Sequence, residues 1–450
     1  MPRPPAAGEV TTIGVEPRAP ARASGPLESA GDAAAVAMGA LWLVLLALIL
    51  RPRIFVSNDS VSNYVHVWWI AERLWHGHGL PIRFPALASG RALAYPYGFV
   101  PWTFAALLWP LLGDRATTLM LVVGAVAMLG STFFAFPEVR RGWRAATVLA
   151  NPLAVAAIVL GQGPFLWGVS FLLLAVAAWR RRRPGLAAVL AGIGALTHAA
   201  VVLPLLLMLC ALGWVLSDGD DRPALVRAAA VACLIAAPGV VAVAASPVMA
   251  QTDTPTKVVE LAGTLAERLV VIAVPLLLIA MGRLRSRAWA PAAFVVILLA
   301  NPVLGPYFGM HYGWLALRRT PNTALVPFIR SSEFVPGATY RILRAADGKI
   351  GMYQLVRNGA VIDSELFPES IHRKSYRTAE EYSTFLRDRR VDYVLAFHNY
   401  DEFWHTNEHA LLERLASANG CTPTTVGVVL IHRDARFDGY RIARRCAPGG

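Results

Sequence analysis

Residues 56–98, between the first two apolar runs, hold the side chains best suited to chemistry at a membrane surface. Asp59 follows the first run, where partial burial would raise the basicity of its carboxylate and let it act as a general base. Guanidinium groups bind phosphate through paired hydrogen bonds, so the arginines of this segment are candidate phosphate partners. These are Arg73, Arg83 and Arg91. In the simpler alternative, Asp59 only stabilises the first turn of a helix and the arginines are solvated.

Aromatic side chains lie in the same segment of the sequence as Asp59. They are Tyr64, His66, Trp68, Trp69, Tyr95 and Tyr97. Aromatic faces suit sugar rings, so these residues are candidates to line a sugar pocket. Trp and Tyr are also enriched in anchoring belts at membrane interfaces, which is the stronger explanation for Trp68 and Trp69. The segment predicts a helix that ends near Trp75, with Ser57 or Asn58 as its cap.

Short motifs follow further along the chain. They are Asn151–Pro152, Gly161–Gln162 and Thr197–His198, with the basic tract Arg180–Arg183 before the last of them. With Asn58–Asp59 and Tyr95–Pro96–Tyr97 ahead of them, their order resembles the GT-C superfamily of polyprenyl-phosphate-sugar-dependent glycosyltransferases, especially bacterial mannosyltransferase-like members. The resemblance covers roughly residues 35–215.

The resemblance implies a polyprenyl phosphate sugar as donor and a cell-envelope glycan, lipid or protein hydroxyl as acceptor. Asp59 would deprotonate that hydroxyl, which would displace the phosphate in a single inverting step. Arginine or a divalent metal would stabilise the leaving phosphate; no other cofactor and no metal ligands are predicted. The expected substrate-binding residues are Asn58, Tyr64, His66, Arg91, Tyr95, Tyr97, Gln162, His198 and His311.

The sequence departs from the family pattern at two places. Gly163–Pro164–Phe165 follows Gly161–Gln162 where the family commonly has Asp or Asn, and His198 stands where many members have Lys. A neutral His198 offers a phosphate no fixed charge. A non-catalytic scaffold with a GT-C-like fold is therefore an alternative. A transporter is less favoured, because Asp and Glu are absent from the central apolar runs.

The composition requires these residues to be positioned by a membrane-embedded body. Of 450 residues, 56% are hydrophobic and 16% are charged, too apolar for an ordinary soluble enzyme. We predict a polytopic α-helical membrane protein with about ten spanning runs. These lie at 34–50, 99–112, 118–136, 145–160, 165–179, 185–199, 201–216, 224–245, 269–281 and 288–304.

Charge predicts the orientation. The net charge of +13 is concentrated in short tracts such as Arg180–Arg183, which indicates cytoplasmic loops and does not favour nucleic-acid binding. The turn at Gly161–Gln162 and everything after Gly305 would then lie outside. Strict alternation would place 56–98 inside, however, so one of the runs within 99–136 is expected to be re-entrant or broken.

Three parts of the chain are expected. Residues 1–32 are predicted to form a disordered cytoplasmic tail without a signal peptide. Residues 33–317 are predicted to form a GT-C-like membrane domain in a plasma membrane, with an external first loop at 56–98. Residues 318–450 predict a small extracytoplasmic α/β domain that binds the acceptor or a partner. Its expected strands are 339–343, 352–356, 392–396 and 425–431, and its helices 378–389 and 408–418. The motif 397–401 follows a strand, where ligands often bind in α/β domains.

The four cysteines divide by environment. Cys210 and Cys233 lie in apolar runs, where inert thiols are expected. Cys421 and Cys446 lie in the polar C-terminal region, and we expect them to pair if that region faces an oxidising compartment.

Overall fold

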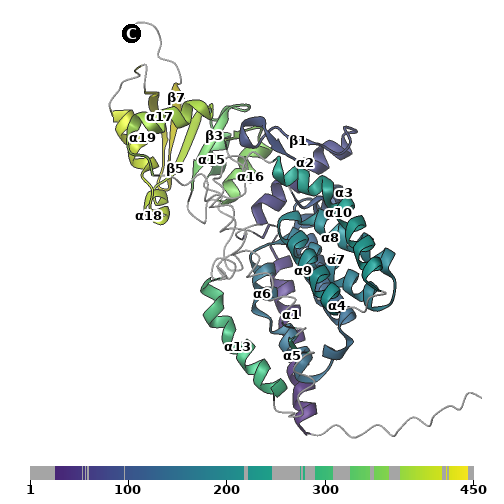
Figure 1. The fold of residues 1–450 in the computed structure, drawn as a ribbon. Helices are drawn as coiled ribbons and strands as arrows, with labels where there is room; N and C mark the ends of the chain where they lie inside the picture. The colour runs from purple at the N-terminus through teal and green to yellow at the C-terminus, as the bar shows by residue number, and fades with distance from the viewer. Residues whose placement is uncertain are drawn as a thin grey trace, which may run out of the picture.

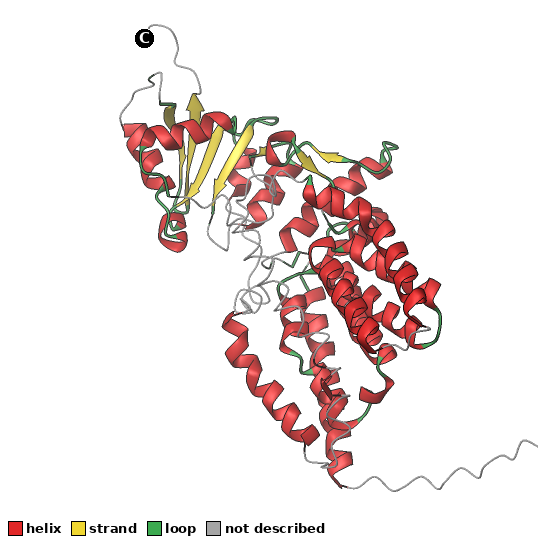
Figure 2. Ribbon diagram, in the orientation of Figure 1, coloured by secondary structure: helices red, strands yellow, loops and turns green. Residues whose placement is uncertain are grey.

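A body of helices carries a smaller domain with a β-sheet at one end (Figures 1 and 2). The computed structural model describes residues 26–52, 54–55, 57, 60–95, 97–216, 221–245, 274, 277–278, 289–307, 325–344, 349–363, 375–417, 422 and 425–443. Asn58, Asp59, His311, Cys421 and Cys446 lie outside these residues, so the predictions about them stay predictions.

The helical body is built from apolar helices. Those long enough to cross a membrane are α1 (Pro26–Leu50), α4 (Arg115–Ala135), α7 (Gly163–Arg180), α10 (Arg222–Ala244) and the pair α5 (Gly142–Leu149) and α6 (Pro152–Val159). Shorter apolar helices are α3 (Phe99–Leu112), α8 (Pro184–Thr197), α9 (Ala199–Leu216) and α13 (Trp289–Tyr307). Of the predicted run 269–281, the structure describes only Val274, Leu277 and Leu278.

The outer surface of these helices is apolar. Val36 on α1, Val126 on α4 and Leu234 on α10 are all more than half exposed. Exposed apolar side chains along several neighbouring helices require a hydrocarbon environment. The protein is therefore a polytopic helical membrane protein, as the composition predicts.

Two predicted boundaries need correction. Helix α1 begins at Pro26, so residues 26–32 of the predicted tail are helical. Asp32 links this part of α1 to α5, because its Oδ1 accepts a 2.9 Å hydrogen bond from the backbone N–H of Gly142. The predicted run 145–160 is two helices, because the buried Asn151 caps α6 by accepting a 3.0 Å hydrogen bond from the backbone of Leu153. Pro152 occupies the first position of α6, where its missing N–H costs nothing.

Small residues let the central helices approach closely. A Cβ on Gly194 of α8 would lie 2.8 Å from the carbonyl oxygen of Gly168 on α7, and one on Gly192 would lie 2.7 Å from Ile235 of α10. Close backbone approach at small residues is how membrane helices gain packing energy. Glycine at these positions therefore fixes the packing of α7, α8 and α10.

Hydrogen bonds and ion pairs identify the two ends of the helical body. One, the arginine end, holds the ion pairs Arg180–Glu138 and Arg182–Asp221. The other, which we call the loop end, holds the Gly161 turn and the start of helix α2 (Ser60–Trp75), where Asn63 Nδ2 donates a 2.7 Å hydrogen bond to the carbonyl of Gly161.

Both ends of helix α3 lie at the loop end. The backbone N–H of Gly98, just before α3, donates a 2.7 Å hydrogen bond to Thr197 at the end of α8. Asp114, just after α3, pairs with Tyr353 of the C-terminal domain. Helix α3 therefore lies along the loop end and does not cross the helical body, and this accounts for the inconsistent alternation in the sequence.

The C-terminal domain is a five-stranded mixed sheet in the order β4-β3-β5-β7-β6. Strands β3 (Thr339–Leu343), β4 (Val361–Ile362) and β5 (Tyr393–Phe397) are parallel, and β7 (Phe437–Ala443) and β6 (Gly427–Arg433) continue the sheet antiparallel. Helices α17 (Ala379–Asp388) and α19 (Glu408–Ser417) cover one face, with α18 (Tyr400–Trp404) before α19. Helices α15 (Leu325–Arg330) and α16 (Lys349–Arg357) pack on the other.

The prediction of a strand at 352–356 is wrong, because this segment belongs to α16. A five-residue apolar run cannot distinguish a strand from a buried helix by periodicity. Strand β3 is parallel to β4, and a parallel pair requires a crossover connection, which α16 supplies. The predicted strands at 339–343, 392–396 and 425–431 and both predicted helices are present, within one or two residues.

Orientation in the membrane is tested by cysteine labelling. In a protein with its four native cysteines replaced, we expect Asn358→Cys, in an exposed turn of the C-terminal domain, to react with an impermeant maleimide in intact cells. The matched control, Arg182→Cys at the exposed arginine end, should react only after permeabilisation. The reverse pattern would show that the predicted orientation is inverted.

Candidate functional site

The candidate site lies at the loop end, where segments distant in the sequence meet. Gly161 has a φ of +77°, and a Cβ there would lie 2.6 Å from Ser57 Oγ and 2.7 Å from Ser60 Cβ. Ser57 and Ser60 flank residues 58–59, and the backbone N–H of Ser57 donates a 2.7 Å hydrogen bond to Ser60 Oγ. The Gly161 turn therefore packs against Ser57 and Ser60, the described residues on either side of 58–59.

A chain of hydrogen bonds ties this corner together. Trp102 Nε1 of α3 donates to Asn63 Oδ1 at 2.8 Å, and Asn63 in turn donates to Gly161. All three residues are buried. Sequence reasoning missed Asn63, although its place four residues after Asp59 in the sequence is a signal that could have found it.

The predicted residues Tyr97 and His198 are brought together. Their rings lie 4.9 Å apart, and Phe165 of α7 lies edge-on to His198 at 6.4 Å. The contact is fixed by the hydrogen bond between Gly98 and Thr197, the neighbours of these two residues. Gly98 has a φ of +87°, and a Cβ there would lie 2.6 Å from the ring of Trp102.

His66 is buried in the middle of this region. Its ring stacks on Trp102 with centroids 4.1 Å apart and meets Phe84 edge-on at 5.6 Å. Nδ1 lies 2.8 Å from the carbonyl oxygen of Ser62, which can only accept, so Nδ1 carries the proton. Burial lowers the pKa of His66 to about 4, although this hydrogen bond opposes the shift. The imidazole is therefore neutral at physiological pH.

Tyr64 links the first loop to both other parts of the protein. Its hydroxyl accepts a 2.8 Å hydrogen bond from the backbone of Phe55 and lies 2.7 Å from Thr118 Oγ1 of α4. Its ring lies 5.8 Å from that of Tyr353 on α16. Burial raises the pKa of Tyr64 well above the ordinary value, so the hydroxyl stays protonated.

The other predicted substrate-binding residues that the structure describes are less buried than Tyr64 and His66. Tyr95 is half-buried beside Phe99, with ring centroids 4.8 Å apart, and burial raises its pKa to about 12. Arg91 is exposed at the start of β2 (Ala92–Leu93), which pairs with β1 (Arg83–Phe84). Gln162 is half-buried and precedes α7. Their roles as substrate contacts stay predictions.

Among the described residues, metal-ligating side chains gather in the C-terminal domain and not at the loop end.

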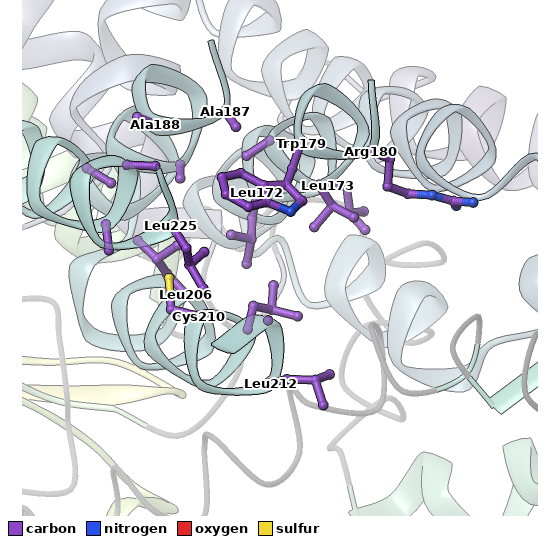
Figure 3. A pocket seen from close by; sticks show the side chains of 18 of the residues that line it. Leu172, Leu173, Trp179, Arg180, Ala187, Ala188, Leu206, Cys210, Leu212 and Leu225 are labelled. Atoms are coloured by element: carbon purple, nitrogen blue, oxygen red, sulfur yellow. The ribbon is translucent and has the colours of Figure 1, made fainter. Parts of the chain in front are cut away.

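A cavity of about 360 Å³ lies at the arginine end, between α7, α8, α9 and α10 (Figure 3). Its lining is almost entirely apolar, including Leu172, Trp179, Leu206 and Leu225, and Arg180 lies at its edge. Such a lining suits hydrocarbon and offers a sugar few hydrogen bonds. The candidate site therefore stays at the opposite, loop end.

The solved structures similar to this chain include ArnT from Cupriavidus metallidurans bound to undecaprenyl phosphate and the same protein in the apo state. Identity is 15% and 14%, the TM-scores are 0.44 and 0.46, and each comparison covers 90% of this chain and 97% of that chain. No protein-family model and no curated protein matches the sequence.

The packing of the Gly161 turn is tested by Gly161→Ala. The positive φ and the contact with Ser57 should make this change cost about 1–3 kcal/mol. Gly130→Ala is the matched control, because a Cβ at Gly130 meets nothing within 4 Å. Thermal unfolding of the purified proteins should show a lower midpoint for Gly161→Ala alone. Equal midpoints would contradict the tight packing.

The buried neutral His66 predicts a pH dependence of stability. Its native pKa of about 4 lies below the ordinary value of 6.5, so the unfolded state takes up the proton first as the pH falls. The stability contribution of His66 is thus complete above pH 6.5 and is lost toward pH 4. About 2 kcal/mol should be lost at pH 5.

The measurement compares unfolding midpoints at pH 7.5 and pH 5. His66→Gln should show a smaller drop than wild type, because its side chain does not titrate. His76→Gln is the control, since the His76 side chain is 66% exposed. An unchanged drop in His66→Gln would contradict the burial argument.

Proposed function

We propose that the protein is a membrane glycosyltransferase that moves a sugar from a polyprenyl phosphate donor to a hydroxyl of a cell-envelope glycan, lipid or protein. The supporting observation is the convergence at the loop end. The residues beside Asp59 pack on the Gly161 turn, and Tyr97 packs on His198. In the sequence, these are the motifs whose order resembles the GT-C superfamily.

The proposed reaction is a single displacement. Asp59 accepts the proton of the acceptor hydroxyl, and the oxygen of that hydroxyl attacks the anomeric carbon of the sugar. The bond between that carbon and the phosphate oxygen breaks, and the phosphate leaves with the bonding electron pair. The configuration at the anomeric carbon is inverted, because attack and departure take place on opposite faces.

The surrounding residues divide the remaining work in this proposal. Gln162, Tyr97 and His198 offer hydrogen-bonding groups and aromatic faces to the sugar. Arg91 is exposed, its Nε donates a 3.4 Å hydrogen bond to the carbonyl of Ala88, and its guanidinium is the candidate to bind the phosphate. His66 is neutral and buried, so it contributes packing and no charge. The site would face outside the plasma membrane, on the side of the C-terminal domain.

Asp59→Asn tests the role of the carboxylate. The change keeps the size of the side chain and removes its basicity, so transfer should fall on the order of 100-fold or more. The measurement is transfer of label from radiolabelled polyprenyl phosphate sugars to membrane acceptors. Glu72→Gln is the matched control, because Glu72 is the other acidic residue of 56–98, and it should keep wild-type activity.

Folding is checked in the same samples by the thermal unfolding midpoint, which should match that of wild type. Wild-type transfer by Asp59→Asn would contradict the catalytic role of Asp59. If wild type itself transfers none of the sugars tested to any membrane fraction, the scaffold alternative replaces the enzyme.

A further inference from the structure

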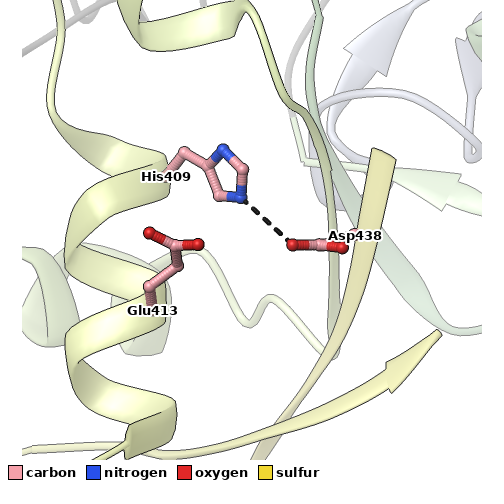
Figure 4. A group of neighbouring side chains, drawn as sticks. All are labelled: His409, Glu413 and Asp438. Atoms are coloured by element: carbon pink, nitrogen blue, oxygen red, sulfur yellow. Dashed lines mark ion pairs between the residues drawn. The ribbon is translucent and has the colours of Figure 1, made fainter. Parts of the chain in front are cut away.

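Three side chains of kinds that ligate metals meet on the C-terminal sheet. His409 and Glu413 lie one turn apart on α19, and Asp438 faces them from β7 (Figure 4). One ligand atom from each lies within 4.8 Å of the others. His398, directly after β5, has its ring parallel to that of His409, with centroids 6.0 Å apart. The three ligand residues therefore join helix α19 to strand β7, with His398 beside them.

The two oxygens of Asp438 each face one imidazole. His409 Nε2 lies 3.5 Å from Oδ2, and His398 Nε2 lies 3.4 Å from Oδ1. Both distances exceed those of an ordinary N–H···O hydrogen bond. Neighbouring ligand atoms around a tetrahedral zinc ion, with bonds of about 2.0–2.1 Å, lie about 3.3 Å apart. His398 makes a long hydrogen bond to Asp438, whereas the spacing of His409 and Asp438, which form none, fits two ligands of one ion.

His409 supplies a second, independent observation. The residue is only 9% exposed, and its Nε2 makes no hydrogen bond within the described part of the chain. Leaving a buried polar nitrogen without a hydrogen bond is unfavourable. In Figure 4 this nitrogen points toward Asp438. A cation between them would use the lone pair that the protein leaves unused.

Arg433 competes for the same carboxylate. Its Nε and Nη2 donate to Asp438 at 3.0 and 3.1 Å, and the Tyr440 hydroxyl donates to Oδ2 at 3.3 Å. The Arg433 side chain is 60% exposed, so it is free to turn into water when a cation binds.

We propose that His409, Glu413 and Asp438 bind one divalent transition-metal ion, with Zn²⁺ as the best fit, and that water completes its coordination. Imidazole nitrogen and carboxylate oxygen are both zinc donors, and a three-residue site leaves the fourth position to water. The bound ion would fasten α19 to β7, and so stabilise the domain. This site lies apart from the loop end and does not depend on the proposed transferase activity.

Zinc titration of the full-length protein tests the site. The protein is purified without an affinity tag, stripped with a chelator and titrated with ZnCl₂ by calorimetry, and its thermal unfolding is followed with and without zinc. We expect one zinc ion per chain and a raised unfolding midpoint. Glu413→Gln should weaken binding by at least about tenfold, and because Glu413 is exposed, this variant should fold normally.

Three further variants sharpen the result. His432→Gln is the matched control: His432 pairs with Glu333 at 2.8 Å elsewhere in the domain, and the variant should bind zinc as wild type does. Asp59→Asn should also bind normally, which separates this site from the transferase proposal. Arg433→Gln should tighten binding several-fold by removing the competing cation.

Absence of zinc binding by wild type, or equal zinc affinity of wild type, Glu413→Gln and His409→Gln, would overturn the proposal. Weaker zinc binding by Arg433→Gln would also contradict it, because Arg433 would then support the ion rather than compete with it.

Discussion

The buried contact between Tyr64 and Tyr353 holds the three parts of the protein in one arrangement. Tyr64 joins the first loop to α4 through Thr118, and its ring packs on Tyr353 of the C-terminal domain. The Tyr353 hydroxyl then donates to the buried Asp114, at the end of α3. Because these groups are buried, leaving any of them unpaired is costly. The loop end is therefore assembled only when helices, loop and sheet domain are all docked.

This contact is supported by a continuous core. Val61 and Phe84 of the first loop share an apolar cluster with Leu355 of α16 and Phe437 of the sheet. Backbone hydrogen bonds continue the contact, with Ile362 donating to Ala86 at 2.7 Å. The first loop is thus built as part of the C-terminal domain's core. A substrate bound at the loop end would therefore have the sheet domain beside it, consistent with a role of that domain in acceptor binding.

The sequence predicted the individual helices and strands well and the contacts between distant segments poorly. Long apolar runs define α4 and α7, because an apolar composition over about 20 residues is nearly enough to specify a membrane helix. Thr378 signals the start of α17, where its Oγ1 accepts a 3.2 Å hydrogen bond from the backbone N–H of Glu381. The order of motifs pointed to Tyr97 and His198, which do meet. The Asp114–Tyr353 pair joins residues 239 apart, and nothing local in either segment signals the other. The helix at 349–357 likewise connects the parallel strands β3 and β4, and the local sequence does not reveal that these strands pair in parallel.

Docking of the sheet domain also determines which charges reach the loop end. His66 is neutral there and brings no fixed charge, whereas arginines from two elements do. The first loop brings Arg91, and α16 brings Arg357, whose Nη1 lies 3.6 Å from Asp114 while 40% of its side chain stays exposed. Arg357 reaches this end only because Tyr353, one helical turn earlier, is held by Asp114. The contact that fixes the domain thus also supplies a guanidinium beside the first loop, where a phosphate leaving group under the proposed function would need it.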